Sequence, residues 1–336
     1  MDNIGREKFW NVLLNLHDNT PASVDTLMKA YPWPKTLCRF RSVSQDSLQQ
    51  LNDNKQLFSS PDHYDDPFDT YCYINIDEMV QEYDNMRLKL SKGDNELFET
   101  LQKLATAIRW QPNFFIDELN RDSLDFDKVK GRLRHVPESI KKKLFSICFC
   151  EDPYNETLWI KYAGNYSGFV QVYDIEDPNT FLCGKETYCQ NCRMSIEPPS
   201  IYPVYYSDTR YDATKYAVGT FLIDKIMAQN DPTLVNLYNL VSRDLMWEAE
   251  RVSLIKKKCH ENDQEWRMIR PAINEQRSCI KMKPSMVIIG LRTPDYESRL
   301  IVSAAVNAGI KSIHKLYIND SDILDSKPVE DGLYHI

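Results

Sequence analysis

Apolar positions recur along this chain with two periods. A spacing of about three to four residues predicts helices, whereas alternation or a short apolar run predicts strands. The predicted strands lie at 37–43, 57–60, 144–149, 168–173, 202–206, 265–269, 286–289 and 314–318. The shorter predicted helices lie at 7–16, 47–52, 155–162, 215–227, 234–250 and 298–308. This irregular succession predicts an α+β fold with a mixed, mainly antiparallel sheet and flanking helices, and not a doubly wound α/β sheet.

The same patterns divide the chain into regions. Helical periodicity is continuous over 76–143, which we interpret as a helical insertion. A second, cysteine-bearing insertion is expected at 180–200. We expect an N-terminal helical segment at 1–34, a single catalytic-like α+β domain at 35–325 and a C-terminal tail at 326–336.

Composition narrows the class of protein. The chain has 336 residues, of which 42% are hydrophobic and 27% charged, as in ordinary globular proteins. Its formal net charge of −8 argues against a large nonspecific nucleic-acid footprint. The N-terminus lacks the pattern of a signal peptide, and no apolar run is long enough to span a bilayer. We therefore expect a cytoplasmic chain without a membrane partner, whose nine cysteines are reduced.

Phosphate recognition here cannot use a glycine-rich loop. Glycine is scarce, with 10 residues, and neither the Rossmann nor the P-loop fingerprint occurs. Arg39 and Arg41 instead lie two residues apart on a predicted strand, so their side chains share one face. Two guanidinium groups there either pair with acidic neighbours or form a fork for phosphate or carboxylate.

Two groups of acidic residues are candidates for chemistry. Asp263 and Glu265 flank the start of a predicted strand and are expected to point the same way, as acid/base or cation-stabilising groups. The alternative is that they pair with Arg267 or with the lysine run at 256–258. The acidic loop at 62–69 is interpreted mainly as a turn whose Asp side chains cap backbone N–H groups, and as a metal site only in the alternative.

Aromatic and cysteine clusters have two interpretations each. Trp159 and Tyr162 have helical spacing, which is typical of core packing or of a stacking surface for a planar ligand. A zinc site would use Cys183, Cys189 and Cys192, but their C-x5-C-x2-C spacing lacks a fourth ligand, which Cys259 or His260 could supply although nothing in the sequence requires it. We therefore expect no metal, with zinc at these cysteines as the alternative.

Several motifs occur in an order that resembles a large bacterial family known only as a domain of unknown function. The resemblance covers about residues 35–325 and is carried by L-x-R-F-R-S at 37–42, S-S-P-x-x-Y-x-D-P-F-D at 59–69, C-F at 148–149, W-x-x-Y-A with G-F at 159–169, and E-W-R at 265–267. The chain departs from the family pattern at four places: at Asp65, where the family has Asn; at Cys150, where it has Ser; at Ile160-Lys161, where it has Ser-His; and at His260, where it has Trp.

That family in turn resembles the ADP-ribosyltransferase superfamily. The resemblance implies an ADP-ribosyltransferase-like sheet and NAD as the substrate. It implies Glu265 as the catalytic carboxylate and Asp263 as the group that orients or activates the acceptor. The positions matching the family's NAD-binding residues are Arg39, Arg41, Cys150, Trp159 and Tyr162.

The function expected from this resemblance is an NAD-dependent ADP-ribosyltransferase or NAD glycohydrolase, with a toxin-like or phage-defence role by analogy. The acceptor would be a protein, a nucleic acid or water. Two alternatives stay open. One is a metal-dependent nuclease or phosphoesterase that uses Asp65, Asp66, Asp69 and Glu265, and the other is a non-catalytic binding or regulatory protein.

Overall fold

The computed structural model describes most of the N-terminal and C-terminal parts of the chain and several strands in between. The described residues are 3–16, 20–70, 73–75, 77–78, 81, 138, 141–142, 144–177, 179–182, 201–214, 216, 247–271 and 279–329. The predicted zinc cysteines lie outside these residues. The helix predicted at 215–227 also lies outside them, except for Tyr216. The same is true of nearly all of the insertion predicted at 76–143.

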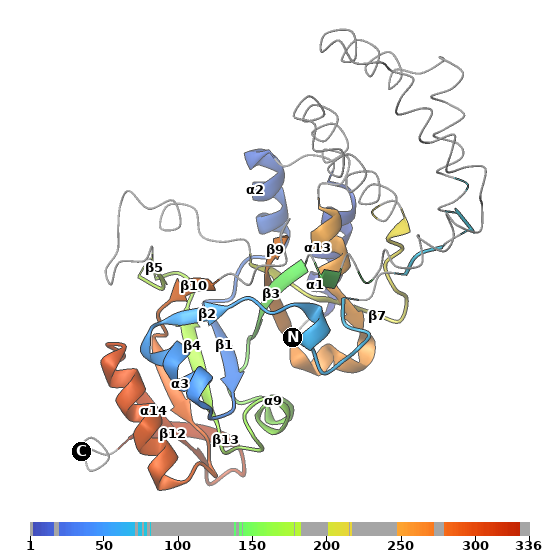
Figure 1. Ribbon diagram of the computed structural model, residues 1–336. Helices are drawn as coiled ribbons and strands as arrows, with labels where there is room; N and C mark the ends of the chain where they lie inside the picture. The colour runs from blue at the N-terminus through green and yellow to red at the C-terminus, as the bar shows by residue number, and fades with distance from the viewer. Residues whose placement is uncertain are drawn as a thin grey trace.

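An eight-stranded, mostly antiparallel sheet forms the centre of the fold (Figure 1). Its strand order is β13-β12-β11-β4-β1-β3-β9-β6, and β11 and β12 are its parallel pair. The strands are β1 (Thr36–Arg41), β3 (Leu144–Cys150), β4 (Phe169–Asp174), β6 (Ile201–Pro203), β9 (Glu265–Pro271), β11 (Met286–Ile289), β12 (Ser312–Ile318) and β13 (Leu324–Pro328). The predicted α+β class is confirmed.

Two small sheets and several helices complete the described part of the chain. One sheet has the order β2-β10-β5, and the other pairs β7 with β8 in parallel. Their strands are β2 (Lys55–Leu57), β5 (Phe181–Leu182), β7 (Tyr205–Ser207), β8 (Ile255–Lys257) and β10 (Cys279–Met282). The helices are α1 (Asn3–Leu14), α2 (Pro21–Ala30), α3 (Gln45–Asn52), α9 (Glu156–Lys161), α13 (Glu248–Ser253) and α14 (Asp295–Asn307), with 3-10 turns η1 (Pro61–His63) and η3 (Lys258–Asp263).

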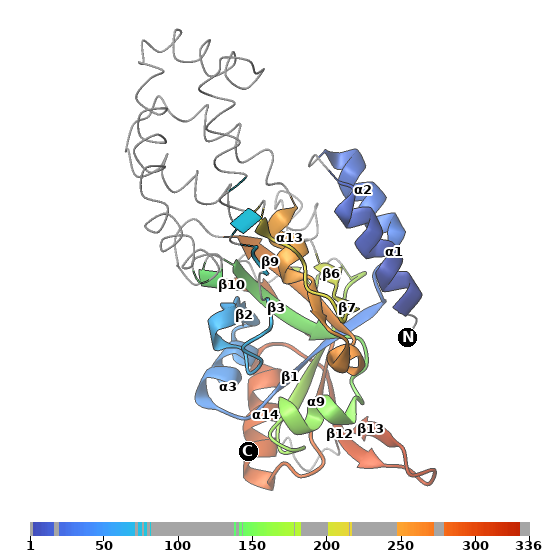
Figure 2. The same cartoon turned by 90° about the vertical axis from the view of Figure 1, so that its right-hand side faces the viewer.

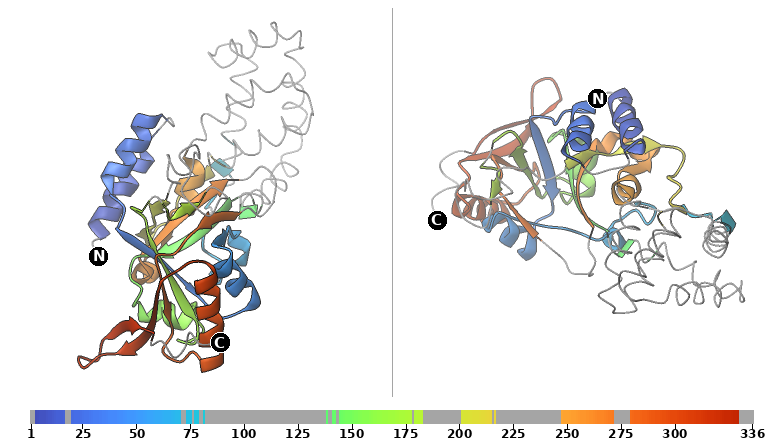
Figure 3. Two further views of the ribbon diagram at one scale, coloured as in Figure 1. Left: turned by 90° about the vertical axis from the view of Figure 1, so that its left-hand side faces the viewer. Right: turned by 90° about the horizontal axis from the view of Figure 1, so that it is seen from above.

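Helices cover both faces of the half of the sheet that contains β4, β11 and β12 (Figure 2). On one face, α14 and α3 bury a cluster that includes Ile301, Leu51 and Val287. On the other face, α9 buries Trp159 against strand residues such as Val170. Burial of these apolar side chains stabilises the fold because it removes hydrocarbon surface from water. The β12–β13 hairpin extends beyond these layers (Figure 3).

The sheet opens between β1 and β3. β1 pairs with β4 over its whole length, from Thr36 to Arg41, but it pairs with β3 only at Cys38 and Cys150. The backbone of Ser146, further along β3, pairs instead with Ser59. A gap is therefore left beside β1, and the residues that follow Cys38 line it.

The sequence pattern and the structure differ at several element boundaries. The strand β13 extends to Pro328, so the sheet continues past the tail boundary predicted after residue 325. The helix α2 lies within the segment at 1–34 that was predicted to be helical, but no separate helix was predicted there, although Pro21 at its start and Thr20 as its N-cap are typical helix-start signals. No helix among the described residues has the length and apolar character needed to cross a membrane.

Candidate functional site

A cavity of about 700 Å³ lies in the opening between β1 and β3. Arg39 and Arg41 line it from β1, and Ser146, Cys148 and Cys150 line it from β3. The rest of its wall comes from the acidic loop, from the end of α9 and from the segment around η3, in the residues His63, Tyr64, Asp65, Asp66, Pro67, Asp69, Lys161, Tyr162, Lys256, His260, Asp263 and Glu265. The structure thus brings the predicted arginines and the predicted carboxylates to one cavity.

The two arginines have neutral partners. Arg39 Nη1 donates to Gln56 Oε1 at 2.6 Å, and Arg41 Nη2 donates to Gln50 Oε1 at 3.1 Å. In the described part of the chain, neither guanidinium has a carboxylate within 4.0 Å, while salt bridges form elsewhere in the cavity. Burial lowers the pKa of both arginines, and for Arg41 the neighbouring Arg39 lowers it further, to about 10. Within the described part of the chain, this end of the cavity therefore carries two guanidinium groups without a direct ion-pair partner, although Asp46 acts on Arg41 from a greater distance.

Two buried glutamines lie behind Arg39, outside the residues that line the cavity. Gln56 Nε2 donates to Gln171 Oε1 at 3.3 Å, and Gln171 lies directly opposite Arg39 in the β1–β4 register. Gln171 is 1% exposed, and its Nε2 has no hydrogen-bond partner among the described residues. A buried donor without a partner is costly, so this amide adds to the local cost of the arginine end.

The predicted carboxylates converge on one lysine. Lys256 Nζ lies 3.1 Å from Asp263 Oδ2 and 3.0 Å from Glu265 Oε2. They share a side of the cavity, but not through strand periodicity as expected. Asp263 ends η3 and Glu265 begins β9, and between them Gln264 adopts a left-handed conformation with φ 45°.

Arg267 neutralises the opposite side of the same cluster. Its Nε donates to Glu265 Oε1 at 2.6 Å, and its Nη1 and Nη2 donate to Asp69 Oδ1 and Oδ2 at 2.8 and 2.7 Å. Arg267 is 0% exposed, and Asp69 comes from the acidic loop. Glu265 thus contacts both partners named in the alternative interpretation: Arg267, and Lys256 of the lysine run.

These ion pairs shift the ionisation of the cluster. Arg267 and Lys256 hold the pKa of Glu265 far below its usual range, although burial alone would raise it. The carboxylates in turn raise the pKa of Lys256. Burial, followed by the charge of Glu265, raises the pKa of Cys148 to about 12. At neutral pH the site therefore contains an ionised Glu265 next to a protonated thiol.

His260 connects the acidic loop to this cluster. Its Nε2 lies 3.2 Å from Asp66 Oδ2, and its Nδ1 lies 3.7 Å from Asp263 Oδ2. Lys161 Nζ lies 3.6 Å from the other oxygen of Asp263. Asp263 is therefore in contact with two lysines and one histidine at the cavity wall.

Of the predicted aromatic pair, only one member lines the cavity. Tyr162 lines it and is 40% exposed, and partial burial raises the pKa of its hydroxyl to about 12. Trp159 is fully buried, stacks on Tyr166 at a centroid distance of 6.0 Å and donates from Nε1 to the Pro153 carbonyl. Trp159 is therefore a core residue in this structure, and its ring faces no ligand space. Cys150 lines the cavity but is 3% exposed.

The acidic side chains do not form a metal-binding group in the described part of the chain. Asp66, Asp69 and Glu265, which the metal-dependent alternative requires, each contact a basic side chain. Carboxylates that coordinate a hard cation need their oxygens directed at one point. Here those oxygens are directed at His260, Arg267 and Lys256.

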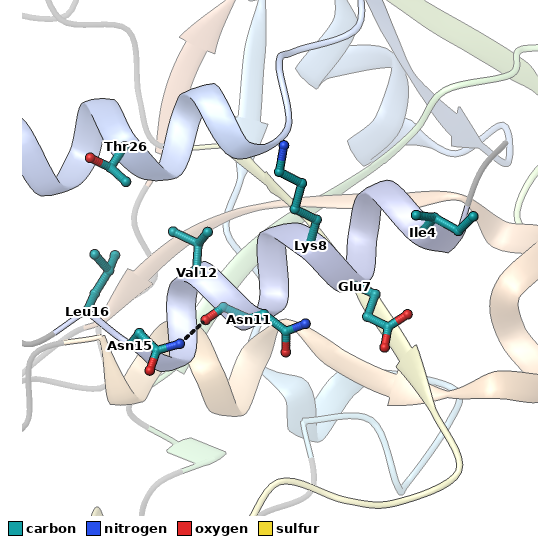
Figure 4. A pocket seen from close by; sticks show the side chains of 8 residues that line it. All are labelled: Ile4, Glu7, Lys8, Asn11, Val12, Asn15, Leu16 and Thr26. Atoms are coloured by element: carbon teal, nitrogen blue, oxygen red, sulfur yellow. Dashed lines mark hydrogen bonds between the residues drawn. The ribbon is translucent and has the colours of Figure 1, made fainter.

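A second hollow, of about 630 Å³, lies along α1 near α2 (Figure 4). Its side chains include Glu7, Lys8, Asn11 and Thr26, and the labelled residues point in different directions around the two helices. No convergent set of charged groups forms there among the described residues. The cavity between β1 and β3 is therefore the stronger candidate site.

Sequence reasoning missed the residues that position Glu265. Lys256 was considered only as part of a lysine run, and Asp69 only as part of an acidic turn or as a ligand in the metal-dependent alternative. Burial was the missing signal, because Lys256 is 8% exposed and Asp69 is 4% exposed. Charged residues are rarely buried unless they are paired, so their positions in this cluster depend on tertiary structure.

Comparison of the whole chain with protein-family models, with curated proteins and with solved structures gives no match. The interpretation of the cavity therefore depends on its own geometry and charge.

Proposed function

We propose that this protein binds NAD in the cavity between β1 and β3 and cleaves its nicotinamide–ribose bond, as an ADP-ribosyltransferase or an NAD glycohydrolase. One observation carries this proposal. Two arginines that have no carboxylate within 4.0 Å among the described residues, and an ionised, buried glutamate, line the same cavity of about 700 Å³. That volume lies within the range of small-molecule and cofactor sites.

The arginine end fits the diphosphate of a dinucleotide. Arg39 and Arg41 have guanidinium N–H groups to spare, since within the described part of the chain each donates one side-chain hydrogen bond, to a glutamine. Guanidinium groups bind phosphate oxygens with paired, charge-assisted hydrogen bonds. A bound diphosphate would also supply the negative charge that this end of the cavity lacks.

The glutamate end fits the reacting ribose. In the proposed reaction the bond between the nicotinamide nitrogen and the ribose carbon breaks, and its electron pair leaves with nicotinamide. Positive charge then develops on the ribose, as in glycoside hydrolysis. A fixed anion such as Glu265 stabilises that charge, and an acceptor hydroxyl or water forms the new carbon–oxygen bond and releases its proton.

The contacts of Glu265 leave room for this role. Its two oxygens have about four lone-pair sites; Arg267 and Lys256 contact one oxygen each, and the Cys148 thiol hydrogen-bonds to the same carboxylate. These cations keep the carboxylate ionised and fixed in position. We assign Asp263 to orienting the acceptor and Tyr162, at the cavity wall, to stacking on a ring of the substrate.

A second candidate function is supported by the same cluster. Because Glu265 already faces two cations, part of its charge is neutralised before any substrate binds. This favours a non-catalytic binding protein that uses the arginine end to hold a nucleotide and the glutamate cluster only for stability. The two candidates agree on binding and differ on chemistry.

A titration of the full-length protein with NAD tests the binding that both share. We expect saturable heat of binding for the unmodified chain and weaker binding for Arg39→Gln. Arg299→Gln is the matched control, because this arginine is exposed on α14, away from the cavity. Equal affinity of all three proteins would contradict the proposed site.

A further inference from the structure

Two cysteines meet at the point where the sheet opens. Cys38 of β1 and Cys150 of β3 lie directly opposite each other, and they form the single register pair between these strands. They are 112 residues apart in the sequence. The described structure holds both as free thiols.

We propose that Cys38 and Cys150 form a reversible cross-strand disulfide when the protein meets a hydroperoxide. This proposal is independent of the function proposed above. It adds a modification site at the junction between the two walls of the cavity.

The backbone geometry supports this bond. Directly opposite residues of antiparallel strands have Cα atoms about 4.5 to 5.5 Å apart, and disulfides join Cα atoms about 4.4 to 6.8 Å apart. Opposite residues also direct their side chains to the same face of a sheet. The Cys38 thiol already points across the strands, because its Sγ donates to the Cys150 carbonyl oxygen at 3.1 Å.

Access for the oxidant comes from the cavity. Both cysteines line it, although their side chains are only 1% and 3% exposed. A small hydroperoxide is the class of oxidant that fits such a site. A bulky disulfide reagent does not fit, because the sulfur that it has to reach is nearly buried. Burial also raises the pKa of Cys38, so we expect slow oxidation that accelerates at alkaline pH, where more thiolate forms.

The chemistry balances in two steps. A thiolate attacks the peroxide, the O–O bond breaks, and a sulfenic acid and one water are formed from hydrogen peroxide. The second thiol then attacks the sulfenic sulfur, the S–S bond forms, and the hydroxyl leaves as a second water. The two sulfurs together lose two electrons, which reduce the peroxide.

The neighbouring thiol provides an internal control. Cys148 also lines the cavity and is more exposed than Cys150, but its register partner is Arg267 and not a cysteine. If exposure alone decided reactivity, Cys148 and the exposed Cys259 and Cys279 would be modified first. The geometry instead selects Cys38 and Cys150 for disulfide formation.

Peptide mapping of the full-length protein tests this proposal. The protein is treated with hydrogen peroxide, denatured in iodoacetamide to block free thiols, digested, and analysed by mass spectrometry with and without dithiothreitol. We expect a dithiothreitol-sensitive peptide that joins Cys38 to Cys150. It should persist in Cys148→Ser and be absent from Cys150→Ser, and oxidation should raise the thermal midpoint of the unmodified chain because it closes a long loop.

The unmodified chain alone is sufficient to overturn the proposal, so the test does not depend on the folding of a variant. If Cys38 and Cys150 are recovered alkylated while other cysteines are oxidised, the proposed pair is wrong. The same conclusion follows if both remain alkylated after prolonged peroxide treatment at alkaline pH.

Discussion

Asp69 and Arg267 lie 198 residues apart in the sequence and form a two-point ion pair, with Nη1–Oδ1 and Nη2–Oδ2 distances of 2.8 and 2.7 Å. Arg267 Nη1 also donates to the Ser253 carbonyl at 2.7 Å. The pair attaches the acidic loop to β9 and holds Arg267 against Glu265. Both side chains are buried, so removal of either partner leaves the other as a buried charge without its ion-pair partner.

We therefore predict that Asp69→Asn lowers the free energy of unfolding by about 3 kcal/mol, the scale observed for broken buried ion pairs. Urea denaturation measures the change. The control is Asp25→Asn, because Asp25 and Lys29 form an ion pair whose side chains are 60% and 75% exposed. The control should change stability by less than about 1 kcal/mol. Equal effects of the two substitutions would show that the buried pair is not structurally important.

The depressed pKa of Glu265 predicts a pH dependence of stability. In the unfolded chain a glutamate titrates near pH 4.3, whereas Lys256 and Arg267 keep this one ionised to lower pH in the folded chain. Between those two pKa values the unfolded state binds more protons. The stabilisation is therefore complete above about pH 4.3 and is lost as the pH falls toward the folded pKa.

Unfolding curves of the unmodified chain and of Glu265→Gln between about pH 3 and pH 7 test this sign. The unmodified chain should be the more stable at pH 7, and the difference should shrink as the pH falls. A difference that stays constant or grows toward acid pH would contradict the assigned ion pairs.

Substitution of Arg41 is predicted to increase stability but to weaken NAD binding. Its guanidinium has a neutral partner and a like-charged neighbour, Arg39, that lowers its pKa. Arg41→Gln should raise the free energy of unfolding by about 1 kcal/mol, the size of gain expected when a functional strain is relieved. The same substitution should weaken NAD binding by about tenfold or more, because it removes a charge-assisted contact. Chemical denaturation and calorimetry measure the two effects, and a parallel loss of both would indicate a purely structural arginine.

Trp159 and Tyr162 provide a matched aromatic pair at the end of α9. Trp159→Phe should lower the thermal midpoint, because the buried indole loses its packing and its hydrogen bond to Pro153. Tyr162→Ala should leave the midpoint nearly unchanged, since this ring is 40% exposed, but should weaken NAD binding. Thermal unfolding and calorimetry of both variants separate the two roles. Weaker binding by folded Trp159→Phe alone would reverse the assignment.

The sequence pattern was sufficient to predict the strands that have a strong apolar pattern of their own. The strand predicted at 286–289 is observed with the same bounds, and the strand predicted at 144–149 extends by one residue. Short partner strands such as β10 were missed, because Cys279–Met282 is defined by pairing with β2 and β5 and has no strong pattern of its own. Pairing between distant segments is a tertiary effect that local propensity does not encode.

The site shows the same limit. Strand periodicity predicted that Arg39 and Arg41 share one face of a strand, and in the structure both lie in β1 and line the cavity. It gave the wrong reason for the convergence of Asp263 and Glu265, which depends on Lys256 and on the left-handed Gln264. Trp159 is buried by residues of other elements. Its helical spacing with Tyr162 therefore could not show that Trp159 lies in the core while Tyr162 lies at the cavity wall.

The release of free nicotinamide from NAD tests the central claim most directly. The unmodified chain and Glu265→Gln are incubated with NAD after circular dichroism has shown that both are folded. We predict release by the unmodified chain and a decrease of about 100-fold or more in Glu265→Gln, the scale for loss of a group that stabilises transition-state charge. Equal release by the two proteins, or no release by an unmodified chain that binds NAD together with its acceptor, would contradict the catalytic role of Glu265.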